Sequence, residues 1–327
     1  MRALLWTTAL AAGLYAGYWF VGSHYALQGA EQALAAMKAE GRADYGAVSL
    51  AGFPSRFDLT IEQPRMMSAD GRMAWAAPFL QLFALSYRPN NLIAVWPHDQ
   101  TLSVGPEQLN LHSDDMRASV NLAATTQLAL DHATLDSRGL RLGRADGGAL
   151  LADRLLLASR QAGSAAEHEV VLVLDGLAAD PALKQAIDPT GALPATADQA
   201  KFDAVLAFDR PLDRTLADGG PQLQAIHQIA GHFAWGPVAL DLTGDITIDA
   251  NRDANGNVTL AAHNWRKLFD MAVSAHLIPA ANAPRIEKLL ESLANQSGEK
   301  DVLKLPLSLS DGLVHFGPLP LMPLPKF

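Results

Sequence analysis

The sequence has no cysteine and few charged side chains. Its 327 residues include no Cys, which excludes disulfides, thiol catalysis and thiolate metal sites. Hydrophobic residues make up 49% and charged residues 18%, a balance that excludes an intrinsically disordered protein. Lys and Arg number 25 against 34 Asp and Glu, the net charge is −9, and no basic cluster occurs. We therefore expect no nucleic-acid partner.

Sequence motifs of enzymes and cofactor sites are also missing. There is no phosphate-binding glycine loop, no G-x-S-x-G nucleophile elbow and no H-E-x-x-H zinc motif. We predict a protein that is not an enzyme, with no catalytic residue, no metal and no cofactor. The enzyme alternative requires at least three of the following residues to meet in one cleft: His112, Asp114, His168, His227, His232 and His263.

One segment resembles the first half of a calcium-binding EF-hand loop. Asn251, Asp253 and Asn255 take the places of the first oxygen ligands, and Gly256 takes the place of the turn glycine. The bidentate Glu that closes such a loop is missing, because Ala262 stands there. The same residues suit a tight turn between strands, so we predict a structural turn.

The N-terminus carries the one long uncharged stretch of the sequence. Ala3 to Val21 contains no Asp, Glu, Lys or Arg and spans about 28 Å as a helix, close to the thickness of a bilayer core. Within residues 1–22 we predict a transmembrane anchor with these apolar residues: Leu4, Leu5, Leu10, Leu14, Phe20 and Val21. A cleaved signal peptide is the alternative, although its apolar core is shorter and ends at a small-x-small site.

The flanking charges predict the orientation of this anchor. Arg2 precedes the uncharged stretch, and the next Lys or Arg is Lys38. Since positive residues stay on the cytoplasmic side, we expect a cytoplasmic N-terminus and a periplasmic main domain on the bacterial inner membrane.

After the anchor, the apolar period changes. Residues 23–42 keep helical three- and four-residue steps and predict a stalk. Residues 43–327 then alternate apolar and polar side chains, most clearly in Phe57–Ile61, Phe202–Phe208 and Val238–Ile248. This period of two is typical of strands with one apolar face. Helical stretches are expected near Asp213–Ala230, Asn264–Leu277 and Arg285–Asn295, and Asn255-Gly256 predicts a hairpin turn.

The predicted fold class is therefore α+β and β-rich. We expect an N-terminal transmembrane helix and stalk, then an extended, curved, mostly antiparallel sheet flanked by a few helices. We expect the periplasmic domain to be one unit over residues 43–327 or two sub-regions of about 43–200 and 201–327.

An apolar sheet face beside a membrane predicts a hydrophobic ligand. A groove for lipid or another apolar molecule needs the same residues as a packed core, so the sequence leaves both open. The groove candidates are Leu240, Leu242, Ile246, Ile248, Val258 and Leu260. The alternative function is a scaffold or partner-binding module for envelope assembly, with a sealed core, no ligand and an envelope protein as partner.

Three segments resemble a bacterial envelope family, domain of unknown function 2125. They are Gly52–Phe57, Trp75–Pro78 with Tyr87–Asn90, and Asp311-Gly312 with Gly317–Pro320. The resemblance implies a single-pass envelope protein and transfers no catalytic residue. The anchor followed by alternating strands is also similar in architecture to AsmA-like envelope proteins, thought to shield lipid between membranes.

Overall fold

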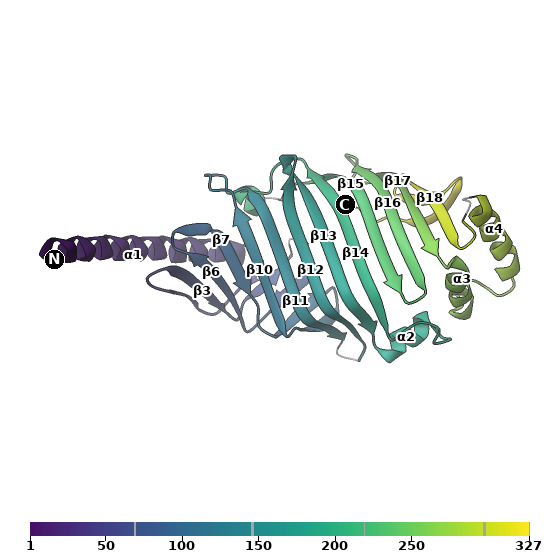
Figure 1. Cartoon of the computed structure of the whole chain (residues 1–327), viewed down its shortest axis with the longest axis horizontal. Helices are drawn as coiled ribbons and strands as arrows, with labels where there is room; N and C mark the ends of the chain where they lie inside the picture. Colours follow the sequence, from purple (N-terminus) through teal and green to yellow (C-terminus); the bar gives the residue numbers. More distant parts are fainter. Residues whose placement is uncertain (69, 145–146, 219, 297–298, 327) are drawn as a thin grey trace. The chain divides into compact units, whose positions relative to one another are not determined.

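The computed structural model describes residues 1–68, 70–144, 147–218, 220–296 and 299–326. The chain forms two compact units. Unit 1 comprises Met1–Ala124 and Leu135–Gly147, and unit 2 comprises Thr125–Thr134 and Gly148–Phe327. The predicted fold class is confirmed, because a long apolar helix precedes strands that pair antiparallel, with few further helices (Figure 1).

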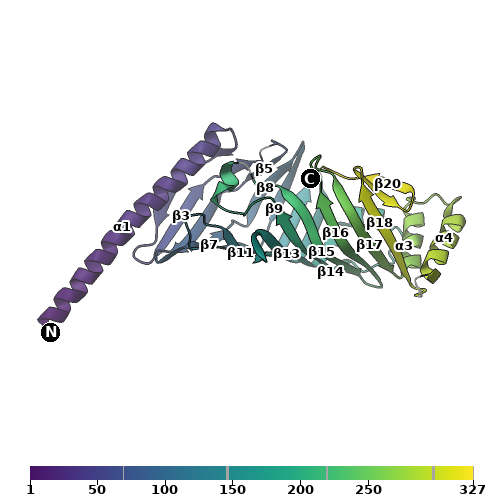
Figure 2. The same ribbon diagram turned by 90° about the horizontal axis from the view of Figure 1, so that it is seen from above.

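Helix α1 (Arg2–Ala39) opens the chain and belongs to unit 1. It runs without a break through the segments predicted as anchor and stalk. Gly41, just after the end of the helix, has a φ of 72°, which few residues other than glycine adopt at a helix end. Figure 2 shows α1 alongside the strands of unit 1.

Unit 1 contains strands arranged in two sets, all of them short except β11. The first set pairs in the order β2-β3-β6-β7-β10, and the second pairs in the order β1-β4-β5-β8-β9-β11. The strands are β1 (Ala43–Asp44), β2 (Val48–Ala51), β3 (Arg56–Glu62), β4 (Arg65–Met67), β5 (Met73–Ala76), β6 (Phe79–Leu85), β7 (Arg88–Val95), β8 (Asp99–Val104), β9 (Glu107–His112), β10 (Asp115–Leu122) and β11 (Leu130–Arg144), whose first residues belong to unit 2.

Both strand sets and α1 contribute to the core of unit 1. Leu34 of α1 is buried with Ile61 of β3 and Leu80 of β6. Met66 of β4 and Trp75 of β5 pack against them from the second set. Burial of apolar side chains therefore stabilises the C-terminal part of α1 against the strands.

Unit 2 is a meander in which each strand from β12 to β20 pairs with the next. Its elements are β12 (Ala149–Ala162), β13 (Ser164–Ala179), α2 (Pro181–Ile187), β14 (Thr196–Phe208), a 3-10 turn (Arg214–Asp218), β15 (Leu223–Trp235), β16 (Val238–Ile248), β17 (Ala254–His263), α3 (Trp265–Ser274), α4 (Ala283–Gln296), β18 (Val302–Ser310), β19 (Leu313–Phe316) and β20 (Leu319–Pro323). Strands β12 to β17 are long, with 10 to 16 residues each.

The predicted helices at Asn264–Leu277 and Arg285–Asn295 are confirmed as α3 and α4. The prediction of a helix over Asp213–Ala230 is wrong, because Leu223–Ala230 belongs to strand β15 and Arg214–Asp218 forms a 3-10 turn. A bulge explains the error. Gln228 has a φ of 52°, and the register shifts between Ile226 and Ile229. Two apolar residues three apart therefore share a sheet face, which imitates helical spacing.

The hairpin predicted from Asn255-Gly256 is present between β16 and β17, but its turn lies earlier in the chain. Both residues lie inside β17, and the chain reverses at residues 249–253. The Asp249 carboxylate accepts hydrogen bonds from the backbone N–H groups of Asn251 (2.8 Å) and Asp253 (3.0 Å). An aspartate that caps its own turn thus replaces the expected Asn-Gly pair.

Candidate functional site

One face of the unit 2 sheet carries apolar side chains in register across seven strands. We call this line the apolar row. Successive strand pairings align its members from β12 to β18: Leu157, Leu172, Phe202, Gly231, Leu242, Leu260 and Leu305. A second aligned line lies two residues along each strand: Leu155, Leu174, Ala200, Phe233, Leu240, Ala262 and Leu303. With about 4.8 Å between strands, the apolar row is about 29 Å long.

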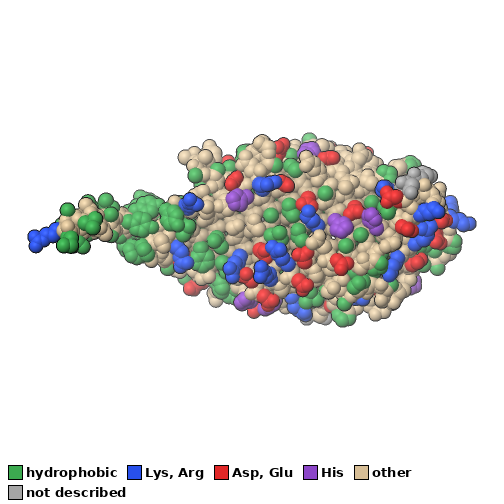
Figure 3. All heavy atoms as spheres, viewed as in Figure 1, with side chains coloured by type: hydrophobic (Ala, Val, Ile, Leu, Met, Phe, Trp, Pro, Cys, Tyr) green, Lys and Arg blue, Asp and Glu red, His purple; other side chains and the backbone are tan. Residues whose placement is uncertain are grey.

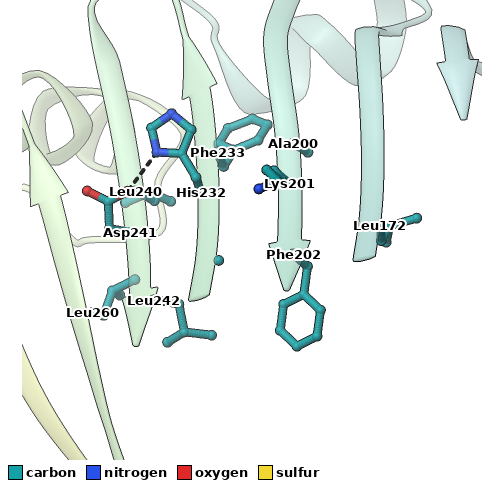
Figure 4. A pocket seen from close by; sticks show the side chains of 11 residues that line it. Leu172, Ala200, Lys201, Phe202, His232, Phe233, Leu240, Asp241, Leu242 and Leu260 are labelled. Carbon is teal, nitrogen blue, oxygen red and sulfur yellow. Dashed lines mark hydrogen bonds and ion pairs between the residues drawn. The ribbon is translucent and has the colours of Figure 1, made fainter. Parts of the chain in front are cut away.

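The middle of the apolar row is hollowed. A cavity of about 200 Å³ is lined on this face by Leu172, Phe202, Leu242 and Leu260. Figure 4 shows the Phe202 and Leu242 side chains pointing the same way from β14 and β16. Between those strands, β15 contributes Gly231, which has no side chain to fill the gap.

Gly231 keeps the hollow open. Its backbone is not in the left-handed region, so a larger residue is conformationally permitted there. A Cβ at this position would lie 3.2 Å from the Leu242 Cβ and 3.8 Å from a ring carbon of Phe202. Any larger side chain would therefore project into the cavity.

The two ends of this face are packed differently from its middle. Near β17 and β18, Trp265 and Phe269 of α3 and Ala294 of α4 are buried against the sheet. Elsewhere Leu324 of the C-terminal segment packs against a cluster that includes Ile229. At the β12 end of the apolar row, Leu157 remains 44% exposed. The face is therefore sealed locally and accessible elsewhere.

The structure places the predicted groove residues at the cavity, in the core, or at both, since Leu240 and Leu242 also pack against buried clusters. Leu240, Leu242 and Leu260 line the cavity. Val258 is buried, with Ile246 and Ile248 packed against its cluster. The predictions missed Phe202, Leu172 and Gly231, which only the strand register brings beside Leu242.

His168 is a buried titratable residue on this face of the sheet. It aligns with Leu206 of β14 and is 1% exposed. Its Nδ1 lies 3.1 Å from the Ser159 hydroxyl. Burial lowers the pKa of His168, while the Ala165 backbone and the charge of Asp131 act in the opposite direction. A lowered pKa keeps the imidazole neutral, which suits an apolar surface.

The opposite face of the sheet is polar. Figure 3 shows Lys, Arg, Asp, Glu and His side chains scattered over the viewed face. There Asp241 lies 2.6 Å from His232 and 2.7 Å from His263. The hydrogen bond with His232 lowers the pKa of Asp241, and the bond with His263 adds to this, against the effect of burial.

The other residues considered for chemistry do not join this group. His112 lies 2.7 Å from Asp99 and 3.8 Å from Asp114, all within unit 1. His227 lies 3.5 Å from Asp245 in unit 2. Among the described residues, no group of three or more His, Asp or Glu side chains is arranged to hold a metal ion.

The side chain of Lys326 lies beside the EF-hand-like segment. The Lys326 ammonium donates to the Asp253 carboxylate (2.7 Å) and to the Asn251 carbonyl oxygen (3.1 Å). The Asp253 carboxylate, one of the ligands that a calcium ion would need, is thus paired with a side chain of the same chain.

The predicted anchor residues are exposed on the N-terminal half of α1. Leu4, Leu5, Leu10 and Leu14 are 65 to 72% exposed, and Phe20 and Val21 are 61% and 58% exposed. Among the described residues, α1 is the one helix long and apolar enough to cross a membrane, with a mean hydropathy of 1.3 in its most suitable window. This composition is consistent with a single-pass anchor and with membrane association.

Comparison with known proteins supports the resemblance noted above. The family model described as "Uncharacterized protein conserved in bacteria (DUF2125)" matches residues 19–325. No curated protein and no solved structure matches the chain. Because the model covers nearly the whole sequence, this chain belongs to the DUF2125 family of bacterial proteins.

Proposed function

We propose that this protein is a single-pass protein of the bacterial inner membrane that binds an acyl chain on the apolar row of unit 2. The N-terminus lies in the cytoplasm and the two β units lie in the periplasm, following the positive-inside rule. The observation that carries the proposal is the hollow at Gly231, inside a row of partly exposed apolar side chains.

The chemistry of such binding is burial. Each methylene removed from water contributes about 0.8 kcal/mol, and association costs on the order of 4–15 kcal/mol. A chain must therefore contact much of the apolar row and not only the hollow. Its length of about 29 Å across seven aligned strands provides that contact area. No charged group on this face is needed to hold the chain itself.

The function is non-enzymatic in this proposal. The hollow is lined on its own face by aliphatic and aromatic side chains, while His232 and Asp241 project from the opposite face. A bound chain would therefore be shielded and not chemically altered.

Substitution of Gly231 by leucine tests the proposal. The new side chain fills the hollow, so we expect the Gly231→Leu protein to retain at least fivefold less acyl lipid than the wild type. The measurement is mass spectrometry of lipid extracted from full-length protein purified in one detergent, expressed per mole of protein.

Ala230→Leu is the matched control. Ala230 is the preceding residue of β15, pairs with Thr243 and lies exposed on the polar face. The control should retain as much lipid as the wild type. Equal lipid in all three proteins would argue against the site and favour the alternative function, a scaffold for envelope assembly.

A further inference from the structure

Helix α1 contacts unit 1 before its uncharged stretch ends. The Tyr15 hydroxyl lies 3.1 Å from the Ser86 hydroxyl, and the Tyr18 hydroxyl donates to the Ser86 carbonyl oxygen at 2.7 Å. The Trp19 indole N–H donates to the Arg56 carbonyl oxygen at 2.8 Å, and Trp19 is 6% exposed. The strands of unit 1 are therefore attached to α1 within the helix segment that we expect in the membrane.

The free part of the helix is too short to cross a bilayer alone. From Ala3 to Leu14 it rises about 18 Å, against a hydrocarbon core of about 30 Å. Tilting the helix would increase this shortage. The missing distance corresponds to about eight residues, which are residues 15–22. The parts of unit 1 that touch these residues must lie at the level of the membrane.

Two turns make up that part of unit 1. We call the rim residues 52–55, between β2 and β3, and residues 86–87, between β6 and β7. They lie side by side, since the Ser86 N–H donates to the Ser55 carbonyl oxygen at 2.9 Å. The rim exposes large apolar side chains: Phe53 is 54% exposed and Tyr87 is 60% exposed.

Aromatic rings connect the rim to the helix. The Phe53 ring stacks on Phe20 with 5.5 Å between centroids and meets Trp19 edge-on at 5.3 Å. Figure 3 shows hydrophobic side chains crowded where α1 meets the strands of unit 1. Aromatic residues of this kind are enriched at the boundary between lipid and water.

Several backbone carbonyl groups in and beside the rim already accept hydrogen bonds from the protein. The Gly52 carbonyl oxygen accepts from the Arg56 N–H at 2.9 Å, and the Ser55 carbonyl oxygen accepts from Ser86. The Ser86 carbonyl oxygen and, next to the rim, the Arg56 carbonyl oxygen accept from the Tyr18 hydroxyl and the Trp19 indole of α1. An unpaired carbonyl costs several kcal/mol in hydrocarbon, so this pairing favours immersion.

We propose that the rim of unit 1 is inserted into the lipid–water interface of the leaflet through which α1 leaves the bilayer. The partner is phospholipid: Phe53 and Tyr87 lie among the upper acyl carbons. Arg88, the exposed first residue of β7 beside the rim, meets the phosphates. The inference rests on the proposed crossing of the membrane by α1.

The absence of cysteine allows a direct test with single labels. Full-length Ser55→Cys, Tyr87→Cys, Glu62→Cys and Leu10→Cys proteins carry an NBD fluorophore in nanodiscs of phosphatidylethanolamine and phosphatidylglycerol with nitroxide-labelled lipid. Ser55→Cys keeps both exposed aromatic residues. Glu62 is the matched control, because it is exposed at the other end of β3, about 20 Å from Arg56.

We expect quenching at positions 55 and 87 to be at least twofold stronger than at position 62, with strong quenching at position 10. Quenching at position 10 together with equal values at positions 55, 87 and 62 would overturn the rim proposal and leave the anchor intact. Failure to quench at position 10 would overturn both proposals. Circular dichroism equal to that of the wild type confirms that each labelled protein is folded.

Discussion

Two aspartates in the middle of α1 are expected to release the protein from the membrane. Leu10 and Leu14 are 65% and 68% exposed and flank the centre of the uncharged stretch. Each Asp near the middle of a membrane helix costs about 2.5–3.5 kcal/mol, and each lost Leu removes about 0.3–0.6 kcal/mol. The double variant Leu10→Asp/Leu14→Asp therefore loses about 6–8 kcal/mol of insertion free energy. For a window of mean hydropathy 1.3, this abolishes insertion.

The measurement is the fraction of full-length protein that remains in the membrane pellet after carbonate washing. The double variant Gln28→Asp/Gln32→Asp is the matched control. It places the same charges at the same spacing on exposed positions of the same helix, beyond the uncharged stretch. The control should pellet like the wild type. If the Leu10/Leu14 variant also pellets fully, α1 is not the anchor.

Truncation of Trp265 is expected to produce the largest loss of stability in unit 2. The side chain is 2% exposed, packs with Phe269 and Ala294, and donates from its indole N–H to the Lys300 carbonyl oxygen at 3.1 Å. Trp265→Ala leaves a cavity and an unpaired carbonyl, which together cost about 3–5 kcal/mol. Helices α3 and α4 would lose their attachment to β17 and β18.

Hydrogen exchange of amides in β17 and β18 measures this effect within unit 2. A loss of about 3–5 kcal/mol accelerates exchange by about two to four orders of magnitude where large-scale opening limits it. Leu277→Ala is the control, because Leu277 is 78% exposed and its truncation should change stability by about 0.5 kcal/mol at most. If the amide exchange rates of β17 and β18 in Trp265→Ala stay within threefold of the wild-type rates, the described packing is contradicted.

The strands and helices with a clean local pattern could be predicted from the sequence. Val238–Ile248 alternates along nearly its whole length and forms β16. The long uncharged stretch forms the first part of α1. In both segments one period continues without interruption, so local spacing contains the whole signal.

The errors arise where a single residue breaks the period. The bulge at Gln228 moves Ile229 onto the face of Ile226, and local spacing then indicates a helix. The turn at Asp249 depends on a carboxylate that reaches two backbone N–H groups, an interaction that a Gly-based turn signal does not describe.

The candidate site could be predicted only in part because it is made by strand register. Leu242 and Leu260 were identifiable as apolar-face residues of neighbouring strands. Phe202 and Gly231 come from strands farther back in the chain, and only pairing places them beside Leu242. The hollow exists because Gly231 has no side chain, and a glycine adds nothing to the apolar pattern of the sequence.

The contact of α1 with the strands of unit 1 corresponds to a repeated pattern in the sequence. Tyr15, Tyr18, Trp19, Gly22 and Ala26 recur at steps of one helical turn. Three of them hydrogen bond to unit 1, and a Cβ on Gly22 would lie 3.0 Å from the Phe57 ring. Side chains that recur in this way on one helix face indicate a stripe that packs against other elements.

Photocrosslinking with a diazirine-bearing palmitate tests the central claim most directly. Full-length protein in nanodiscs is illuminated with the probe, digested and mapped by mass spectrometry. The account predicts crosslinks on the apolar row, at Leu172, Phe202, Leu242 and Leu260, and at least fivefold fewer of them in Gly231→Leu than in Ala230→Leu. Crosslinks confined to α1 and the rim, with none on the unit 2 sheet in any protein, would contradict it.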